Sequence, residues 1–243
     1  LMPAMSGVDF VGIWANGRMF RGNANNLGQK HWFETESFSL DYSLVTPEHQ
    51  MVKGSFAGSD WNQNEYESYV KRSREKLSLM ERKPVKIDTG EYRTWFESAA
   101  VADFLGMFSW NGISEASLRQ GCSGFGRMRH DDVRLSPKFS VIEDFSPGFC
   151  PKFNSNGEVS AEKLFLIENG ELKNTLVSSR SAKEYGVESN YAESGEYMRS
   201  PKMAAGSLNH EDVVSEVGKG LYLSNIHYLN WSDNAGGRIT GLT

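Results

Sequence analysis

The five histidines are the first residues to test for chemistry, because imidazole is among the commonest zinc ligands in proteins. They are His31, His49, His130, His210 and His227. A zinc-protease helix carries two histidines about one turn apart, with a glutamate that activates the metal-bound water. His210-Glu211 begins such a motif, but Val214 and Ser215 follow where the second histidine would stand. The histidines therefore predict no zinc centre, and Glu211 is explained by the favourable placement of an acid in the first turn of a helix.

Three other groups contain residue types that are common in catalytic or ligand-binding sites, but the residues are not spaced as such sites require. Cys122 lies among Gly and Ser residues, which indicates a flexible loop rather than an activated thiol. His130-Asp131-Asp132 are adjacent, so they cannot all point at one ion in regular structure. The glycines of residues 121–126 lack the lysine and the preceding strand of a phosphate-binding loop. We therefore predict no catalytic residue, no metal ligand and no cofactor site in this chain.

One polar segment has side chains suited to holding a peptide. Residues 178–186 read SSRSAKEYG and lead into further Asn, Ser and Gly residues, which is typical of a loop. Arg180 and Lys183 could bind a carboxylate or a peptide backbone, and Asn190 is the third candidate contact. The alternative is a solvated loop that binds nothing.

Composition sets the class of protein. The chain has 243 residues, of which 39% are hydrophobic and 23% charged, a balance that supports a core without metals or disulfides. A net charge of −5 gives no general attraction for nucleic acid, so we expect no nucleic-acid partner. The two separated cysteines, Cys122 and Cys150, indicate reduced thiols in a cytoplasmic protein. No apolar run approaches the roughly 18 residues of a membrane helix, so no membrane role is expected.

Strand patterns dominate the chain. Residues 8–14 and 18–22 flank Asn16-Gly17, a dipeptide that favours a tight hairpin turn, so we predict a hairpin there. Apolar residues at even positions from 38 to 44 alternate with polar ones, which predicts a strand with one buried face, and residues 51–57 continue the pattern. Residues 164–167 and 172–177 flank Asn169-Gly170 and predict a second hairpin.

Helical spacing appears in three segments. Residues 64–82 predict an amphipathic helix that ends before Pro84, with its basic residues 71–76 on a solvated face. Ser98 is predicted to cap a helix over residues 99–108, and residues 211–217 predict a short helix ahead of a strand over 221–230. Together these patterns predict one α+β domain over residues 1–243, built from antiparallel hairpin-rich sheets with a few amphipathic helices.

Several segments, in order along the chain, resemble the TldD/PmbA family, the so-called modulators of DNA gyrase. They are residues 26–32 (NLGQKHW), 53–58 (KGSFAG), 180–186 (RSAKEYG), 220–225 with 228–230 (GLYLSN and YLN), and 239–243 (ITGLT). The resemblance implies the C-terminal portion of that family, with the family's N-terminal domain and extreme C-terminus absent from this chain.

The resemblance also implies a function. In that family a TldD-type subunit carries a His-Glu-x-x-x-His helix and a later Cys as zinc ligands, and a PmbA-type, TldE-like partner lacks them. Here the corresponding helix, residues 98–105 (SAAVADFL), contains no imidazole, and the Cys position would lie beyond Thr243. The resemblance is therefore to the PmbA-like branch, and it implies a metal-free subunit of a cytoplasmic metallopeptidase assembly that acts on unfolded peptides.

Partners follow from the same resemblance. Zinc is expected only in a TldD-type partner subunit, and the chain is expected to associate with such a subunit or with itself as a homodimer. Two other functions stay open at this point: a non-enzymatic binding or scaffold protein, and a modulator of DNA gyrase.

Overall fold

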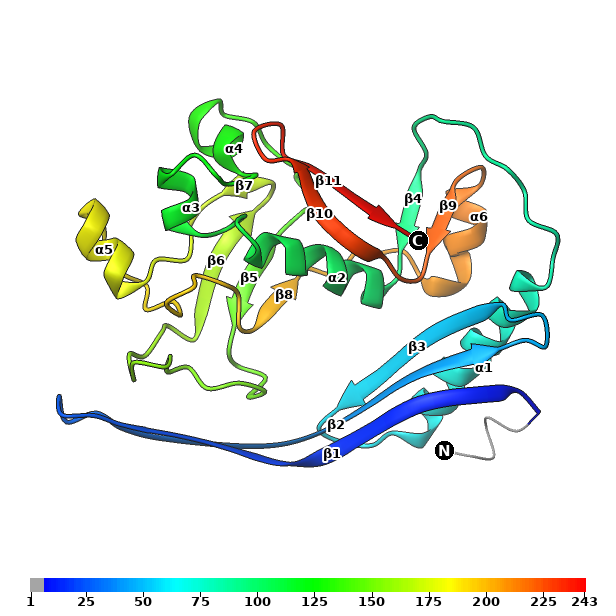
Figure 1. Cartoon of the computed structure of the whole chain (residues 1–243), viewed down its shortest axis with the longest axis horizontal. Helices are drawn as coiled ribbons and strands as arrows, with labels where there is room; N and C mark the ends of the chain where they lie inside the picture. The colour runs from blue at the N-terminus through cyan, green and yellow to red at the C-terminus, as the bar shows by residue number, and fades with distance from the viewer. Residues whose placement is uncertain (1–6) are drawn as a thin grey trace.

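The computed structural model describes residues 7–243, and its antiparallel sheets and interspersed helices confirm the predicted α+β class (Figure 1). The strands are β1 Asp9–Ala24, β2 Lys30–Val45, β3 Met51–Gly58, β4 Thr94–Phe96, β5 Val141–Asp144, β6 Lys163–Glu168, β7 Glu171–Leu172, β8 Pro201–Met203, β9 Leu221–Leu223, β10 His227–Asp233 and β11 Arg238–Leu242. The helices are α1 Gln63–Met80, α2 Ser98–Ser109, α3 Glu115–Arg119, α4 Gly126–His130, α5 Ser179–Tyr185 and α6 Val213–Val217, with a 3₁₀ turn at His210–Asp212. Among the described residues, no helix combines the length and the apolar character that crossing a membrane requires.

The N-terminal part, residues 7–80, is an antiparallel sheet in the order β1-β2-β3 with α1 packed on one face. The predicted alternation along β2 is confirmed, because Leu40, Tyr42 and Leu44 are buried against α1. The Tyr42 hydroxyl and the Ser73 Oγ of α1 lie 2.8 Å apart in a buried hydrogen bond. Burial raises the pKa of Tyr42 to about 12, so this hydroxyl stays protonated and serves packing.

The first predicted hairpin is wrong, because β1 runs without a turn through Asn16 and Gly17, which pair with Phe38 and Ser37 of β2. The chain reverses instead at residues 25–29. There the Asn25 Oδ1 accepts hydrogen bonds from the backbone N–H groups of Leu27 and Gln29. The Asn25 side chain therefore stabilises a turn at this point. Because β2 has 16 residues, pairing along its whole length outweighs the local preference of Asn16-Gly17 for a turn.

The C-terminal part, residues 94–243, is built on a sheet in the order β7-β6-β5-β8 and has a separate hydrophobic core. The hairpin at Asn169-Gly170 is confirmed, since both residues have positive φ, 50° and 81°. Its second strand ends at Leu172, earlier than predicted. The strand predicted over residues 221–230 is divided into β9, which pairs in parallel with β4, and β10, which pairs with β11.

The start of α2 differs from the prediction by one residue. Glu97, and not Ser98, occupies the N-cap position, and its side chain makes no capping hydrogen bond. Its carboxylate instead accepts hydrogen bonds from Lys76 Nζ of α1, at 2.8 Å, and from the Tyr222 hydroxyl of β9. Glu97 therefore joins the two parts of the molecule.

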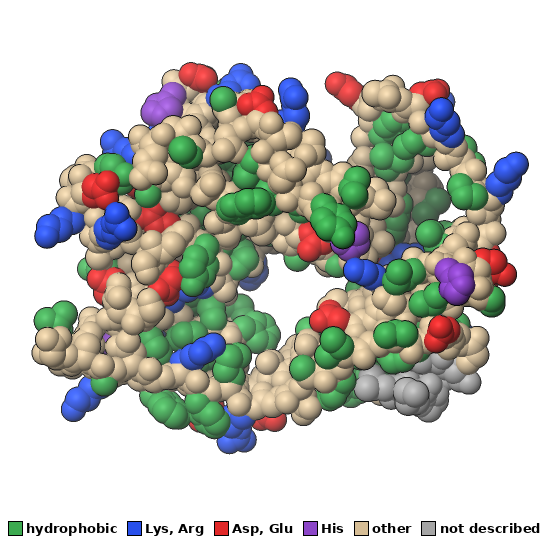
Figure 2. Space-filling view, viewed as in Figure 1, with side chains coloured by type: hydrophobic (Ala, Val, Ile, Leu, Met, Phe, Trp, Pro, Cys, Tyr) green, Lys and Arg blue, Asp and Glu red, His purple; other side chains and the backbone are tan. Residues whose placement is uncertain are grey.

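The two parts meet at a second place, the tip of the β1-β2 hairpin. Asn23 and Asn25 donate side-chain hydrogen bonds to the carbonyls of Ser155 and Asn156, at 3.0 and 3.1 Å. Between this contact and the one at Glu97, Figure 2 shows an opening through the molecule.

Candidate functional site

The first cleft lies between the two parts and has a volume of about 800 Å³. Ser55 and Ala57 of β3 line one side of it, and the α2 residues Ala99, Ala102 and Asp103 line the other. The cleft is therefore bounded by an edge strand and by the helix on which the family resemblance places a metal motif.

The residues of this helix do not fit a zinc ion. Its surface toward the cleft offers one serine, two alanines and one carboxylate, Asp103, which accepts a hydrogen bond from the Ile226 N–H at 3.4 Å. Across residues 7–243, no group of three or more His, Cys, Asp or Glu side chains could hold a metal ion. Zinc needs three or four nitrogen, sulfur or carboxylate ligands that converge on one point, and α2 supplies one such side chain to this cleft.

The second cleft has a volume of about 850 Å³ and lies on the C-terminal part, between α3, α4, the β6-β7 hairpin and residues 187–191. Its charged lining is mainly cationic: Arg119, Arg129 and Lys173 stand against Glu115 and Glu188. The apolar side chains of Leu118, Leu164 and Val177 line the same cleft. The surface therefore combines apolar contacts with positive charge, which suits a polar or acidic peptide segment.

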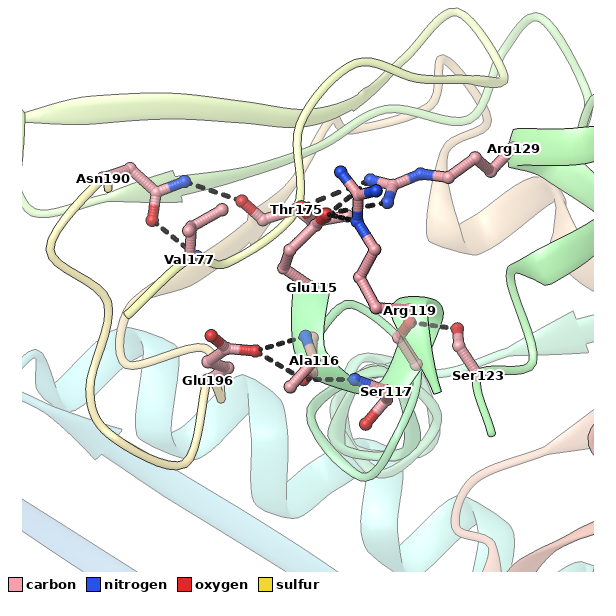
Figure 3. Close-up of polar contacts among 12 residues, drawn as sticks. Glu115, Ala116, Ser117, Arg119, Ser123, Arg129, Thr175, Val177, Asn190 and Glu196 are labelled. Atoms are coloured by element: carbon pink, nitrogen blue, oxygen red, sulfur yellow. Dashed lines mark hydrogen bonds and ion pairs between the residues drawn. The ribbon is translucent and has the colours of Figure 1, made fainter. Parts of the chain in front are cut away.

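A buried carboxylate organises the wall of this cleft (Figure 3). The Glu115 side chain is 4% exposed and receives both Nη atoms of Arg129, at 3.0 and 2.7 Å. Arg119 Nε and Thr175 Oγ1 donate two more hydrogen bonds to it, at 2.8 and 2.6 Å. Burial alone would raise the pKa of Glu115, but these hydrogen bonds and the Arg129 charge outweigh it and lower the pKa to about 2. Glu115 is therefore ionised and fixes both guanidinium groups in place.

A second buried carboxylate, Glu196, accepts hydrogen bonds at the N-terminal ends of two helices. One oxygen accepts from the Ala116 N–H of α3 and the Ser114 hydroxyl, at 2.9 and 2.6 Å. The other accepts from the N–H and the hydroxyl of Ser178, directly before α5, at 2.9 and 3.0 Å. Burial alone would raise the pKa of Glu196, but these hydrogen bonds have the larger combined effect and hold the pKa below its ordinary value. The carboxylate thus holds α3, which carries Glu115 and Arg119, against α5.

The structure places the three predicted peptide contacts apart. Residues 178–186 are not the predicted loop: α5 forms because the Ser178 hydroxyl accepts from the Ser181 N–H and Gly186 closes the helix in a left-handed conformation, with φ of 65°. Arg180, whose side chain is 85% exposed, pairs with Glu184 at 3.8 Å. Lys183 is also exposed on α5. Among the described residues that line the second cleft, Asn190 is present and Arg180 and Lys183 are not.

Asn190 has a positioning role in the cleft wall. Its side chain accepts a hydrogen bond from the Val177 N–H at 2.9 Å and donates one to the Thr175 carbonyl at 2.6 Å (Figure 3). It therefore holds the segment from which Thr175 reaches Glu115. Sequence reasoning missed Glu115, Arg129, Thr175 and Glu196. The available signal was local only: Ser114 and Glu115, followed by Arg119 four residues on, are typical of a short capped helix.

The low pKa of Glu115 predicts a pH dependence. Because the folded-state pKa, about 2, is below the ordinary 4.5, the ionised carboxylate stabilises the fold above about pH 4.5, and this stabilisation is lost as the pH falls through 2. The free energy of unfolding of the wild type should exceed that of Glu115→Gln most near neutral pH, and the excess should shrink toward pH 2. Urea denaturation at a series of pH values measures both. An excess that is constant with pH would contradict the assignment.

Comparisons with known proteins identify a family and a shared fold. A family model described as the PmbA/TldA metallopeptidase C-terminal domain matches residues 89–242. No curated protein matches the chain. Two solved structures with a TM-score of 0.73 are candidate modulators of DNA gyrase: one from Thermotoga maritima, at 18% identity over 95% of this chain, and one from Bacteroides thetaiotaomicron, at 13% over 98%. The chain is also similar to TldE from Thermococcus kodakarensis, with a TM-score of 0.66 and 17% identity over 95% of this chain.

The chain spans 58% of the length of each of these three structures. Identities this low establish a shared fold alone.

Proposed function

The chain belongs to the TldD/PmbA metallopeptidase family, and from this we propose that it is a PmbA-like, metal-free subunit of a peptidase assembly that acts on unfolded peptides. Hydrolysis is then the task of a TldD-type partner that carries the zinc. This chain contributes binding surface and shape to the assembly.

The observation that carries the proposal is the composition of α2 at the first cleft. The helix presents Ala99 and Ala102 there, and the one possible metal ligand that it offers to the cleft is Asp103. Because Asp103 accepts a hydrogen bond from the Ile226 N–H, its carboxylate is tied to the neighbouring segment. The helix can therefore form one wall of a cleft that holds a peptide, but it lacks the ligands for a zinc ion that would cleave the peptide.

An extended peptide has a place to bind along this cleft. β3 is an edge strand of its sheet, and Ser55 and Ala57 are exposed toward the cleft. A peptide can add to such an edge through backbone hydrogen bonds, which is independent of its sequence. The cationic second cleft, with Arg119, Arg129 and Asn190 in its wall, adds a preference for acidic or polar side chains.

Elemental analysis and reconstitution test the proposal. The purified chain should hold substoichiometric zinc and cleave no unfolded peptide alone. Cleavage should appear when a His-Glu-x-x-x-His partner subunit is added, and a chelator should abolish it. Peptidase activity of this chain alone that a chelator blocks would refute the proposal.

A pair of variants tests the role of the first cleft. Ala102 is exposed, so Ala102→Arg should fold normally while it narrows the cleft and lowers partner-dependent cleavage severalfold. Ala205→Arg makes the same change in size and charge at an exposed position that lines neither cleft, and it should leave the rate unchanged. Equal rates of peptide cleavage for both variants would show that the first cleft has no role in cleavage.

Modulation of DNA gyrase is the second candidate, because two of the similar structures carry that description. The net charge of −5 offers no general attraction for DNA, so this role would act through contacts with the gyrase protein. A supercoiling assay with purified gyrase distinguishes the two functions, since the peptidase subunit alone should leave the supercoiling rate unchanged.

A further inference from the structure

A third cleft, with a volume of about 670 Å³, lies between α1 and β3 on one side and α6 and β9 on the other (Figure 1). Its lining is largely apolar, and several of the apolar side chains are well exposed: Met51 by 49%, Leu79 by 50%, Met80 by 46% and Val214 by 76%. A cleft of this size and lining suits the apolar part of a ligand. The two methionines are flexible and can adapt to side chains of different shape.

Four charged side chains line the third cleft, and two of them already have partners. Lys76 donates a hydrogen bond to the Glu97 carboxylate at 2.8 Å. Glu75 lies 4.0 Å from Lys71, one helical turn earlier on α1. Each of these charges is therefore compensated within the chain.

The other two charged side chains of the third cleft are cations, Arg72 and Lys53. Within the part of the chain that the structure describes, neither forms an ion pair. The Arg72 guanidinium lies over the Tyr69 ring, 5.2 Å from its centroid, and this contact holds the group in place. A guanidinium binds a carboxylate best, because the two planar groups can form two parallel hydrogen bonds. The third cleft therefore suits a carboxylate attached to an apolar group.

The first and third clefts follow each other along one strand. Residues 55–57 of β3 line the first cleft, residues 51–53 line the third, and Arg72 lines both. Because β3 is an edge strand, a peptide that pairs with it in the first cleft is directed toward Arg72. Six residue steps separate positions 51 and 57 of β3, which is roughly 20 Å of extended chain. A peptide of about seven residues can therefore occupy both clefts.

The chemistry of the third cleft distinguishes one end of a peptide. The last residue of a peptide is the place where a carboxylate and an apolar side chain are attached to one Cα atom. An internal Asp or Glu has the carboxylate without the apolar side chain, and the amino end has the wrong charge for Arg72. A fatty acid has both groups but no peptide backbone to pair with β3.

We propose that the third cleft binds the carboxyl end of a peptide, with the terminal carboxylate on Arg72 and an apolar last side chain between Met51 and Leu79. The inference rests on the proposed peptide-binding role of the first cleft. It adds a preference for a free carboxyl end that follows an apolar residue, which the edge of β3 alone cannot give.

Direct binding to the purified chain tests this preference. Fluorescence anisotropy would follow a labelled peptide, GSASGAL, with either a free carboxylate or a carboxyl-terminal amide. The free acid should bind about tenfold more tightly, because the amide has nearly the same size without the charge. Replacing the last Leu with Ser should weaken binding of the free acid severalfold. Both comparisons use the unaltered protein, so no variant has to fold.

Variants of α1 identify the cation. Arg72→Gln should weaken binding of the free acid to the level of the amide and leave binding of the amide unchanged. Lys71→Gln is the matched control on the same helix, because this side chain is 78% exposed and lines neither the first nor the third cleft. It should leave the tenfold preference intact.

Three results would overturn the inference: equal binding of the acid and the amide to the wild type, a preference that survives Arg72→Gln, or displacement of the peptide by octanoate as effective as by the unlabelled peptide. No cleavage enters these measurements. A failed reconstitution with a zinc-bearing partner would refute the peptidase role while the end preference held, and equal binding of acid and amide would refute the end preference alone.

Discussion

Replacing Glu115 with alanine is expected to lower the free energy of unfolding by about 3–5 kcal/mol, the range for removing one partner of a buried ion pair. The carboxylate is 4% exposed and satisfies donors from Arg129, Arg119 and Thr175. Without it, two guanidinium groups stand close together with no counter-charge. Urea denaturation at neutral pH, monitored by tryptophan fluorescence, measures the loss.

An exposed ion pair provides the control. Glu184→Ala breaks the pair with Arg180, which lies at 3.8 Å with the Arg180 side chain 85% exposed, and should cost less than about 1 kcal/mol. Because Glu115 also fixes the cationic wall of the second cleft, Glu115→Ala should weaken the binding of acidic peptides under conditions where the variant stays folded. A loss of stability no greater than that of Glu184→Ala would show that Glu115 does not organise the site.

Replacing Glu196 with alanine is expected to cost about 2–4 kcal/mol, because it removes hydrogen bonds at the starts of two helices. The buried carboxylate accepts from Ser114, Ala116 and Ser178, and no solvent can replace it at 2% exposure. Hydrogen exchange gives the sharper readout. Amide protection should fall together in α3 and α5, which are far apart in the sequence.

The matched variant is Glu193→Ala, which removes a carboxylate three residues away. Glu193 accepts from the exposed N–H of Ser155 at 3.1 Å, so its loss should leave protection in α3 and α5 unchanged. If Glu196→Ala lowered protection in only one of the two helices, the carboxylate would not link them.

The elements that sequence reasoning predicted correctly are those that a local pattern determines. The apolar alternation along β2 faces α1 as expected, and Asn169-Gly170 forms its turn because both residues adopt positive φ. The same dipeptide at Asn16-Gly17 gives no turn, because pairing with all of β2 outweighs a local preference. The helix α5 was missed because its polar composition resembles a loop, while its stability comes from a cap at Ser178 and from the distant Glu196.

The candidate site could not be predicted in the same way. Glu115 meets Arg129 across 14 residues and Thr175 across 60, so no short motif contains the cluster. Asn190 was predicted from composition and does lie in the cleft wall, but its bonds to Val177 and Thr175 depend on how the chain returns past β6. Only the absence of an imidazole from residues 98–105 could be read directly from the sequence, and it carries the proposed function.

The two attachments between the N-terminal and C-terminal parts have a topological consequence. Because the parts are joined by hydrogen bonds at the hairpin tip and again at Glu97, the two parts together surround the opening between them. A guest polypeptide that passed through such a closed loop could not escape sideways and would have to slide along its own length until a free end emerged. A cyclic or internally cross-linked polypeptide could not be threaded through the opening unless one of the two contacts between the parts broke.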